Sequence, residues 1–220
     1  KVFIATKSGI RDNHDKEAVL AKVRQSLERL NTDYVDAYSM HACSTIEGLS
    51  HPGYHAAMDE LKAEGRVRFT GVSYHGQAQT NQTGMEDQLV AAAEDGRFDM
   101  MLLVYNFLTH ADGERVIAAC KANNVGATAM KTAPGSLGYQ PVDPENLTDE
   151  QERYVQRFTS RGRSREDALA RLVTQAEQQK AVYDGTRPFA ERYGIRTEEQ
   201  LRLGSIHWVI QNPDMHTACV

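Results

Sequence analysis

"DYVDAYSMHA", residues 33–42, is a run of residues that favours an extended chain and that ends beside a histidine. Val35 and the aromatic residues Tyr34 and Tyr38 are strand formers, and Asp36 interrupts the apolar run without breaking it. The segment therefore predicts a buried β-strand with a titratable side chain, His41, at its carboxyl end.

Strands and helices alternate on both sides of this segment. Apolar or β-branched runs predict strands, and apolar residues repeated at three- and four-residue steps predict amphipathic helices. The expected strands cover 2–6, 33–41, 68–75, 98–106, 126–132 and 216–220, and the expected helices cover 15–30, 53–65, 85–96, 113–124 and 197–212. About six strands separated by five helices are typical of a parallel sheet with crossover helices.

The spacing favours a closed barrel over an open dinucleotide-binding sheet. No G-x-G-x-x-G sequence follows any of the strands, so a Rossmann fold lacks its main support. We expect an α/β fold, a (β/α)8 TIM barrel that is incomplete, with about six of eight strands present. Because the chain starts at Lys1 without a methionine and both ends fall within strands, we expect a fragment.

Residues 136–196 interrupt the alternation before the last helix and strand. The first part of this stretch is rich in Gly, Pro and Asp, and the second part is charged and has a helical pattern. We expect a helical insertion within a single domain spanning 1–220. It is either a solvated surface feature or a lid or partner surface, since long insertions in compact domains are often functional.

Composition excludes several classes of function. The 220 residues carry a formal charge of −5 and no block of basic residues, so a nucleic acid partner is not expected. The three cysteines, Cys43, Cys120 and Cys219, form no CxxC pair, which argues against disulfides and zinc and favours small buried thiols in a reducing, cytoplasmic compartment. No apolar stretch approaches the roughly 18 residues of a membrane-spanning helix, and no signal peptide opens the chain.

Hydrogen-bonding or ionisable side chains stand where the expected strands end. In a (β/α)8 barrel the chemistry lies at this edge, so these residues are the candidates for a site. They are Lys7, His41, Ser73, Tyr74, His75, Tyr105, Asn106, Lys131 and Thr132. Each signal alone is weak, because a single histidine or tyrosine after a strand is more often structural.

Several phrases together resemble the aldo-keto reductase family in order and spacing. They are "TK" at 6–7, "VRQSLERLNTDYVDAYSMHA" at 23–42, "GRVRFTGVSYH" at 65–75, "LLVYN" at 102–106, "ATAMKT" at 127–132 and "IQNP" at 210–213. The phrases "VYNF" and "AMKT" are similar to a branch that often carries an iron–sulfur segment downstream, although the chain has no cluster-binding cysteines.

The resemblance implies a barrel that reduces an aldehyde or ketone, a small-molecule carbonyl substrate, with NADPH. It assigns Lys7 and His41 to the lysine and histidine of the family's Asp, Tyr, Lys and His tetrad. A phenol has an unperturbed pKa of about 10, so a nearby cation such as this lysine is needed to make the tyrosine a useful acid. The aspartate and tyrosine belong to segments that precede Lys1 in the family order, so activity of this fragment alone is doubtful.

The resemblance also implies an NADP(H) site. Ser73 matches a residue that binds the nicotinamide carboxamide, and we expect Tyr74, Tyr105, Asn106, Met130 and Lys131 to contribute to cofactor binding. The chain departs from the family at three positions: Tyr74 replaces an asparagine, Leu102 a glutamine and Met130 a stacking tyrosine. The family's loop for the adenosine phosphate follows the last strand, after Val220.

Two alternatives remain. These departures favour a non-catalytic, aldo-keto-reductase-like interaction or nucleotide-sensing module, and the retained Lys7 and His41 oppose it. The other alternative is a metal-dependent hydrolase that uses His41, His75 or His110. We expect no metal site, because the chain lacks the closely spaced histidine pair that such barrels often carry.

Overall fold

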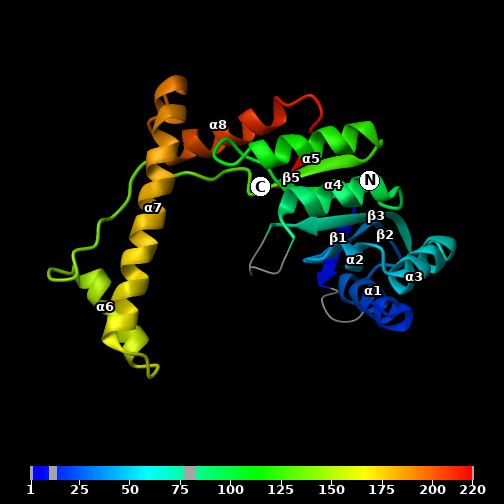
Figure 1. The fold of residues 1–220 in the computed structure, drawn as a ribbon, viewed down its shortest axis with the longest axis horizontal. Helices are drawn as coiled ribbons and strands as arrows, with labels where there is room; N and C mark the ends of the chain where they lie inside the picture. Colours follow the sequence, from blue (N-terminus) through cyan, green and yellow to red (C-terminus); the bar gives the residue numbers. More distant parts are fainter. Residues whose placement is uncertain (1, 10–13, 77–82, 220) are drawn as a thin grey trace. The chain divides into compact units, whose positions relative to one another are not determined.

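The computed structural model describes residues 2–9, 14–76 and 83–219 and shows a parallel sheet flanked by helices (Figure 1). The six strands are β1 (Ala5–Gly9), β2 (Val35–His41), β3 (Val67–Tyr74), β4 (Met100–Val104), β5 (Gly126–Met130) and β6 (Thr217–Ala218). Each strand pairs in parallel with the next, so the order is β1-β2-β3-β4-β5-β6. This sequential order is that of a continuous part of a (β/α)8 barrel wall, which confirms the predicted fold class.

The described helices include every one of the five predicted from periodicity. They are α1 (Lys16–Leu30), α2 (Ile46–Leu49), α3 (Pro52–Ala63), α4 (Met85–Asp95), α5 (Ala111–Ala122), α6 (Asp149–Thr159), α7 (Arg165–Tyr193) and α8 (Glu198–Ile210). Helix α1 shows how the pattern works, because Val19, Val23 and Leu27 lie on one buried face. It ends where Asn31 adopts a left-handed conformation with φ of 51°.

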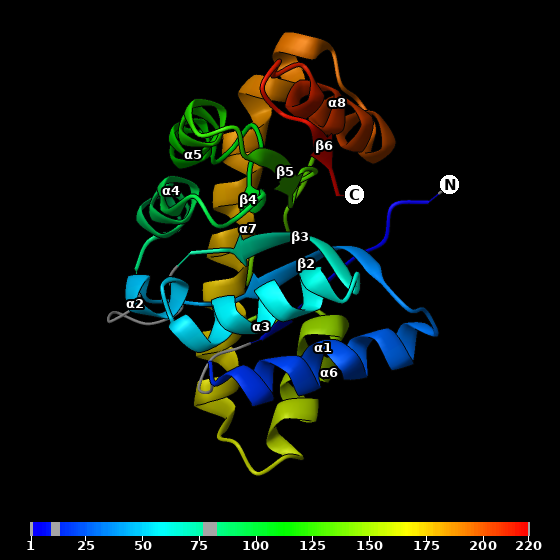
Figure 2. The same cartoon turned by 90° about the vertical axis from the view of Figure 1, so that its right-hand side faces the viewer.

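The hydrophobic core lies between the sheet and the helices that cover its outside. Helices α1, α3, α4 and α5 run along this outer side (Figure 2). Tyr38, Leu61, Leu89 and Leu103 are among the fully buried core side chains. Burying a side chain of this size contributes about 1.5–3 kcal/mol, so this layer supplies most of the apolar stabilisation of the sheet.

The first strand lies further along the chain than its apolar run predicts. The sequence predicts a strand over 2–6 with Lys7 just after it, whereas β1 spans Ala5–Gly9 and contains Lys7. Pairing with β2 sets the register, since Ala5 is opposite Ala37 and Gly9 is opposite His41. Hydrophobicity alone could not locate this strand, because Val2 and Phe3 remain exposed.

The chain divides into two compact units. One comprises Lys1–Thr132 and Ile206–Val220, and the other comprises Ala133–Ser205, which contains the whole of the predicted insertion 136–196. In the second unit α6 packs along α7 (Figure 1). Thr148 and Gln151 form a capping box at the start of α6.

The cysteines lie in two different environments. Cys43 and Cys120 are buried, as expected, but Cys219 is exposed, and all three thiols are free. Burial raises the pKa of the Cys120 thiol to about 11, so this group is protonated at neutral pH. Among the helices that the structure describes, none is long and apolar enough to span a membrane.

Candidate functional site

The two faces of the sheet have different environments. Side chains alternate between faces along a strand, and partner residues of neighbouring parallel strands point to the same face. We call the face turned away from the covering helices the inner face. Its residues include Lys7, Ser39, His41, Ser73, Leu102 and Thr128, which the strand register links to one another.

The inner face is closely packed around its middle row. A Cβ atom at Gly71 would lie 2.8 Å from the Ser39 hydroxyl oxygen and 2.6 Å from Cγ of Met100. A glycine is therefore required where these side chains approach the β3 backbone. Further toward the amino end of the strands, Phe69 is 46% exposed on the same face.

His41 ends β2 and lies beside two residues from the end of β3. Its Nδ1 atom is 3.2 Å from the Ser73 hydroxyl oxygen, and Ser73 is fully buried. The His75 ring contacts the His41 ring edge-on, with centroids 5.4 Å apart and planes inclined at 68°. The next residue, Ala42, has a φ of 57°, and its N–H donates to the Ser73 carbonyl oxygen at 3.1 Å.

Lys7 lies on β1, next to β2, and faces the same side as His41. It pairs with Ser39, two residues before the Gly9–His41 pair, and is exposed. The two side chains predicted to be catalytic therefore share the inner face and occupy neighbouring strands. Lys7 lies level with Ser39, two residues closer to the amino end of the sheet than His41, and not at the carboxyl end of its strand.

The electrostatic environment of this edge is positive. Desolvation by the surrounding protein is the largest cause that lowers the pKa of His75, and the charges of Lys131, His41 and Lys7 add to it. Three basic groups, two from strands β1 and β2 and one from the segment after β5, thus act on His75, which follows β3. Such a region favours an anionic ligand or a developing negative charge.

Lys131 follows β5 in an unusual backbone conformation. Its φ is 53°, in the left-handed region that non-glycine residues rarely adopt. The Asn106 side chain donates from Nδ2 to the Lys131 carbonyl oxygen at 3.0 Å. Met130, immediately before it, is buried and ends β5 opposite Val104, on the inner face.

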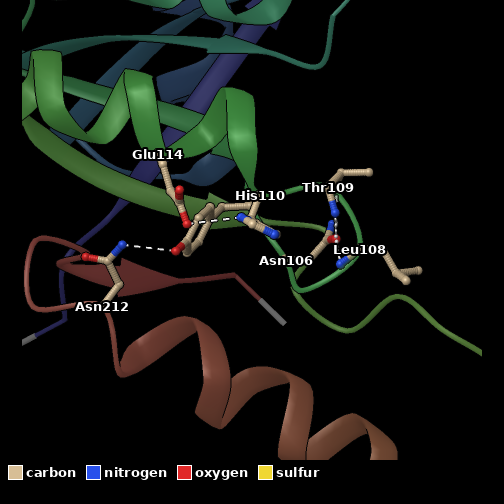
Figure 3. A network of polar contacts seen from close by, with 7 residues as sticks. Asn106, Leu108, Thr109, His110, Glu114 and Asn212 are labelled. Atoms are coloured by element: carbon tan, nitrogen blue, oxygen red, sulfur yellow. Dashed lines mark hydrogen bonds and ion pairs between the residues drawn. The ribbon is translucent and has the colours of Figure 1, made fainter. Parts of the chain in front are cut away.

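Asn106 and Tyr105 have structural contacts. Asn106 Oδ1 accepts hydrogen bonds from the N–H groups of Leu108 and Thr109, at 3.0 and 2.9 Å (Figure 3). The Tyr105 hydroxyl oxygen accepts a hydrogen bond from the side chain of Asn212 at 3.0 Å (Figure 3), and its ring packs beside Trp208. These two residues, both predicted to bind the cofactor, stabilise the loop after β4. Tyr105 also connects this loop to α8 and to the segment that follows α8.

Tyr74 lies on the opposite face of β3 from Ser73. Its ring belongs to the core, and its hydroxyl donates to the carbonyl oxygen of Thr83 at 2.8 Å. Burial raises the pKa of this phenol. Tyr74 and Ser73 thus lie on opposite faces, because neighbouring strand residues point in opposite directions, and the cofactor role of Tyr74 stays a prediction.

The resemblance to the family assigned no role to His75, which the structure places against His41. The sequence places it among the strand tips, but its contact with His41 depends on the pairing of β2 with β3. His110, the other histidine considered as a metal ligand, is the N-cap residue of α5 and pairs with Glu114 at 3.0 Å. Within residues 2–9, 14–76 and 83–219, no three acidic, histidine or cysteine side chains are grouped to hold a metal ion.

Comparisons with known proteins agree with this architecture. Residues 1–199 match the model of the Aldo/keto reductase family. The chain is 32% identical over 81 residues to the uncharacterized oxidoreductase YqkF of Bacillus subtilis (strain 168), covering 33% of the chain and 26% of that relative. It is 34% identical over 73 residues to the methylglyoxal reductase DkgB of Escherichia coli O157:H7, covering 33% of the chain and 27% of that relative.

Solved structures show the same fold at low sequence identity. MGS-M4, an aldo-keto reductase enzyme from a Medee basin deep-sea metagenome library, superposes with a TM-score of 0.55 at 16% identity, over 99% of the chain and 60% of that structure. The thermostable aldo-keto reductase Tm1743, in complex with epalrestat, gives 0.51 at 19% identity, over 99% and 60%. The matches thus span about a quarter of the two curated relatives and 60% of these structures. The family match over 1–199 nevertheless covers most of the sequence, and the chain belongs to the aldo/keto reductase family.

Proposed function

We propose that the protein built from this chain reduces an aldehyde or ketone to an alcohol with NADPH. The observation that carries the proposal is the placement of Lys7 and His41 on one face of neighbouring strands, beside a positively charged edge. In this proposal His41 holds the carbonyl oxygen through Nε2, because Nδ1 faces the Ser73 hydroxyl. Lys7 supplies a fixed positive charge close to the oxygen on which negative charge develops.

The residues present fit a nicotinamide nucleotide in part. The basic groups Lys7 and Lys131 suit an anionic cofactor, and Met130 offers an apolar side chain on the inner face for a nicotinamide ring. The cofactor, when bound, would supply the hydride, and the acid of the family's tetrad, a tyrosine, would supply the proton that completes the alcohol. The Ser73 hydroxyl is bonded to His41 in this structure, and its oxygen can still accept an N–H of the carboxamide that the family implies.

A second candidate, a nucleotide-sensing or interaction module, is favoured by the departures from the family. Tyr74 directs its hydroxyl to the helix-covered side, and Leu102 and Met130 are apolar. These are the three positions at which the chain departs from the family, and none of them adds a polar group to the inner face. This arrangement favours weak binding of a nicotinamide. It is also compatible with a protein that binds the nucleotide without catalysing a reaction.

Energy transfer from Trp208 to NADPH tests both functions on the intact protein. Trp208 is the one tryptophan of the 220 residues and packs beside Tyr105. We expect saturable transfer with a midpoint below about 1 mM, followed by aldehyde-dependent loss of NADPH absorbance. Saturable binding without turnover of any carbonyl compound would support the sensing module. Absence of transfer at millimolar NADPH would contradict both the reductase and the nucleotide-sensing module and would favour an interaction module.

A further inference from the structure

We propose that His75 is a positioning residue that holds the imidazole ring of His41 in the orientation in which it meets a carbonyl oxygen. The inference rests on the proposed function of His41 and extends it to a second residue. His75 immediately follows β3 and has no role in the tetrad assignment.

Two side chains from the end of β3 contact the His41 ring. Ser73 approaches Nδ1 at 3.2 Å, and His75 contacts the ring with its own ring inclined at 68°. The hydrogen bond fixes which nitrogen faces the strand, and the edge-on contact restricts rotation of the ring about its side-chain bonds. Together they restrict the orientation of the His41 ring.

The backbone at this edge supports the same orientation. Ala42 adopts a left-handed conformation and donates its N–H to the Ser73 carbonyl oxygen at 3.1 Å. The chain therefore turns away directly after His41 while remaining bonded to β3. The backbone at His41 is thus paired with β1 and β3, and the ring contacts restrain the side chain further.

The charges around His75 favour a neutral ring. Lys7 from β1, His41 from β2 and Lys131 after β5 are the charged or titratable groups that act on it, and all disfavour its protonation. Desolvation of the ring is the first cause of its lowered pKa. A neutral His75 packs against His41 without adding a further positive charge to this edge.

The other elements near His75 carry acidic side chains, but none of these is among the causes that shift its pKa. His75 shares a pocket with Gly84 and Met85 of the α4 start and with Asp112 of α5, and Asp112 is engaged by Arg115 at 2.7 Å. At the start of α4, Glu86 pairs with Arg115, and Asp87 lies beside Gly84 of the same pocket. Protonation of His75 at acidic pH places an additional cation against His41.

Kinetics of three variants of the intact protein test the role. His75→Ala removes the ring, and we expect kcat to fall about 10- to 100-fold while the Kd for NADPH changes less than about twofold. His75→Phe keeps a ring edge but cannot titrate, so we expect most of kcat to return. His207→Ala, which removes an exposed histidine of α8, is the matched control and leaves kcat unchanged.

The pH profile separates positioning from a general loss of structure. In the natural protein kcat/KM should fall on the acidic side as His75 gains a proton, with a midpoint below the ordinary histidine value of about 6.5. His75→Phe should lose that acidic limb. A His75→Ala variant within twofold of the natural kcat, or a His75→Phe variant as slow as His75→Ala, overturns the proposal.

Nitrogen-15 NMR of the imidazole rings tests the inference without any turnover. We expect His41 to show a single neutral tautomer, with its proton on Nε2, in the natural protein and in His75→Phe. In His75→Ala the His41 signals should shift toward a mixture of tautomers. If no carbonyl compound is reduced, the proposed function fails, and these spectra alone decide the inference: unchanged His41 signals in His75→Ala refute it.

Discussion

Two residues at the carboxyl edge of the sheet adopt backbone conformations that are costly for their type. Ala42 follows His41 with φ of 57°, and Lys131 follows Met130 with φ of 53°. A non-glycine residue in this region costs about 1–3 kcal/mol, and such residues cluster at functional sites. Asn106 holds the second of them through the Lys131 carbonyl oxygen. The strain therefore lies at the ends of strands that carry the candidate site.

Replacing Lys7 tests the proposed catalytic role at the scale of a single side chain. Lys7→Met removes the charge from the inner face and keeps the length of the side chain. We expect turnover to fall by at least about 100-fold, because a charge acting on the transition state is lost. The Kd for NADPH, measured by energy transfer, should change less than about threefold.

Lys180→Met is the matched control for this variant. Lys180 pairs with Asp184 on the surface of α7 at 2.5 Å, and solvent screens an exposed pair of this kind. It should leave both turnover and binding unchanged. Equal losses of turnover and of NADPH binding in Lys7→Met would show that the lysine only binds the cofactor.

The first three strands are joined near their amino ends by a buried carboxylate. The Asp36 side chain is 4% exposed, accepts a hydrogen bond from the Ile4 N–H at 2.9 Å and pairs with Arg68 at 2.7 Å. The Arg68 guanidinium also lies over the Tyr34 ring, 5.0 Å from its centroid. This cluster connects β2 to β3 and to the residue before β1.

Arg68→Met should destabilise the strands because it leaves the Asp36 carboxylate buried without a cationic partner. Since the Arg68 side chain is 48% exposed, solvent screens part of the loss, and we expect about 1–3 kcal/mol. Arg66→Met is the control, since its partner Asp33 is 99% exposed and the pair is worth less than about 1 kcal/mol. Urea unfolding measures both, and equal losses would contradict a special role for the buried pair.

The junction of α2 and α3 contains a buried histidine whose charge state links stability to pH. The His55 ring bonds through Nε2 to the Leu49 carbonyl oxygen at 2.6 Å and is 9% exposed. Burial is the main cause that lowers its pKa, although the bond to Leu49 acts in the other direction. Below the ordinary histidine pKa of about 6.5 the unfolded chain therefore binds more protons than the fold.

The contribution of His55 to stability should be fully present above pH of about 6.5 and should decrease as the pH falls toward its lower folded pKa. His55→Gln cannot titrate, so its free energy of unfolding should depend less on pH in this window than that of the natural protein. His207→Gln, at an exposed position in α8, should keep the natural dependence. Urea unfolding at a series of pH values provides the comparison, and identical slopes for His55→Gln and the natural protein would refute the link.

The whole molecule consists of two units with very different burial. In β2 every residue from Val35 to Met40 is buried, and both neighbouring strands supply hydrogen-bonding partners. Helix α7 is 29 residues long but buries only Ala168, Thr186 and Ala190. Local opening therefore requires far less loss of buried surface in α7 than in β2.

Hydrogen exchange should reveal this difference between the units. We expect amides of α7 to exchange at least about tenfold faster than those of α5, which packs on the sheet and serves as the control helix. Amides of β2 should be among the slowest. Equal protection of α7 and α5, measured by mass spectrometry of matched peptides, would show that the second unit is as stable as the sheet.

Most of the fold and part of the candidate site follow from local sequence patterns. The periodicity of apolar residues in α1, α3, α4 and α5 and the β-rich run of β2 are local features, so the sequence predicts them. The positions of His41 and Ser73 at strand ends follow from the same patterns. The location of β1 does not, because the hydrogen bonds of Ile4 and the pairing with β2 outweigh the apolar run at Val2 and Phe3.

By itself, the sequence determined the alternation of strands and helices, the family and the histidine and lysine that resemble a catalytic pair. Only the tertiary structure decided that Lys7 lies below His41, that Tyr74 faces the core and that His75 contacts His41. The physical reason is that periodicity is a property of one segment, whereas register and facing depend on hydrogen bonds between strands. A shift of one residue in that pairing would turn each side chain to the other face of the sheet.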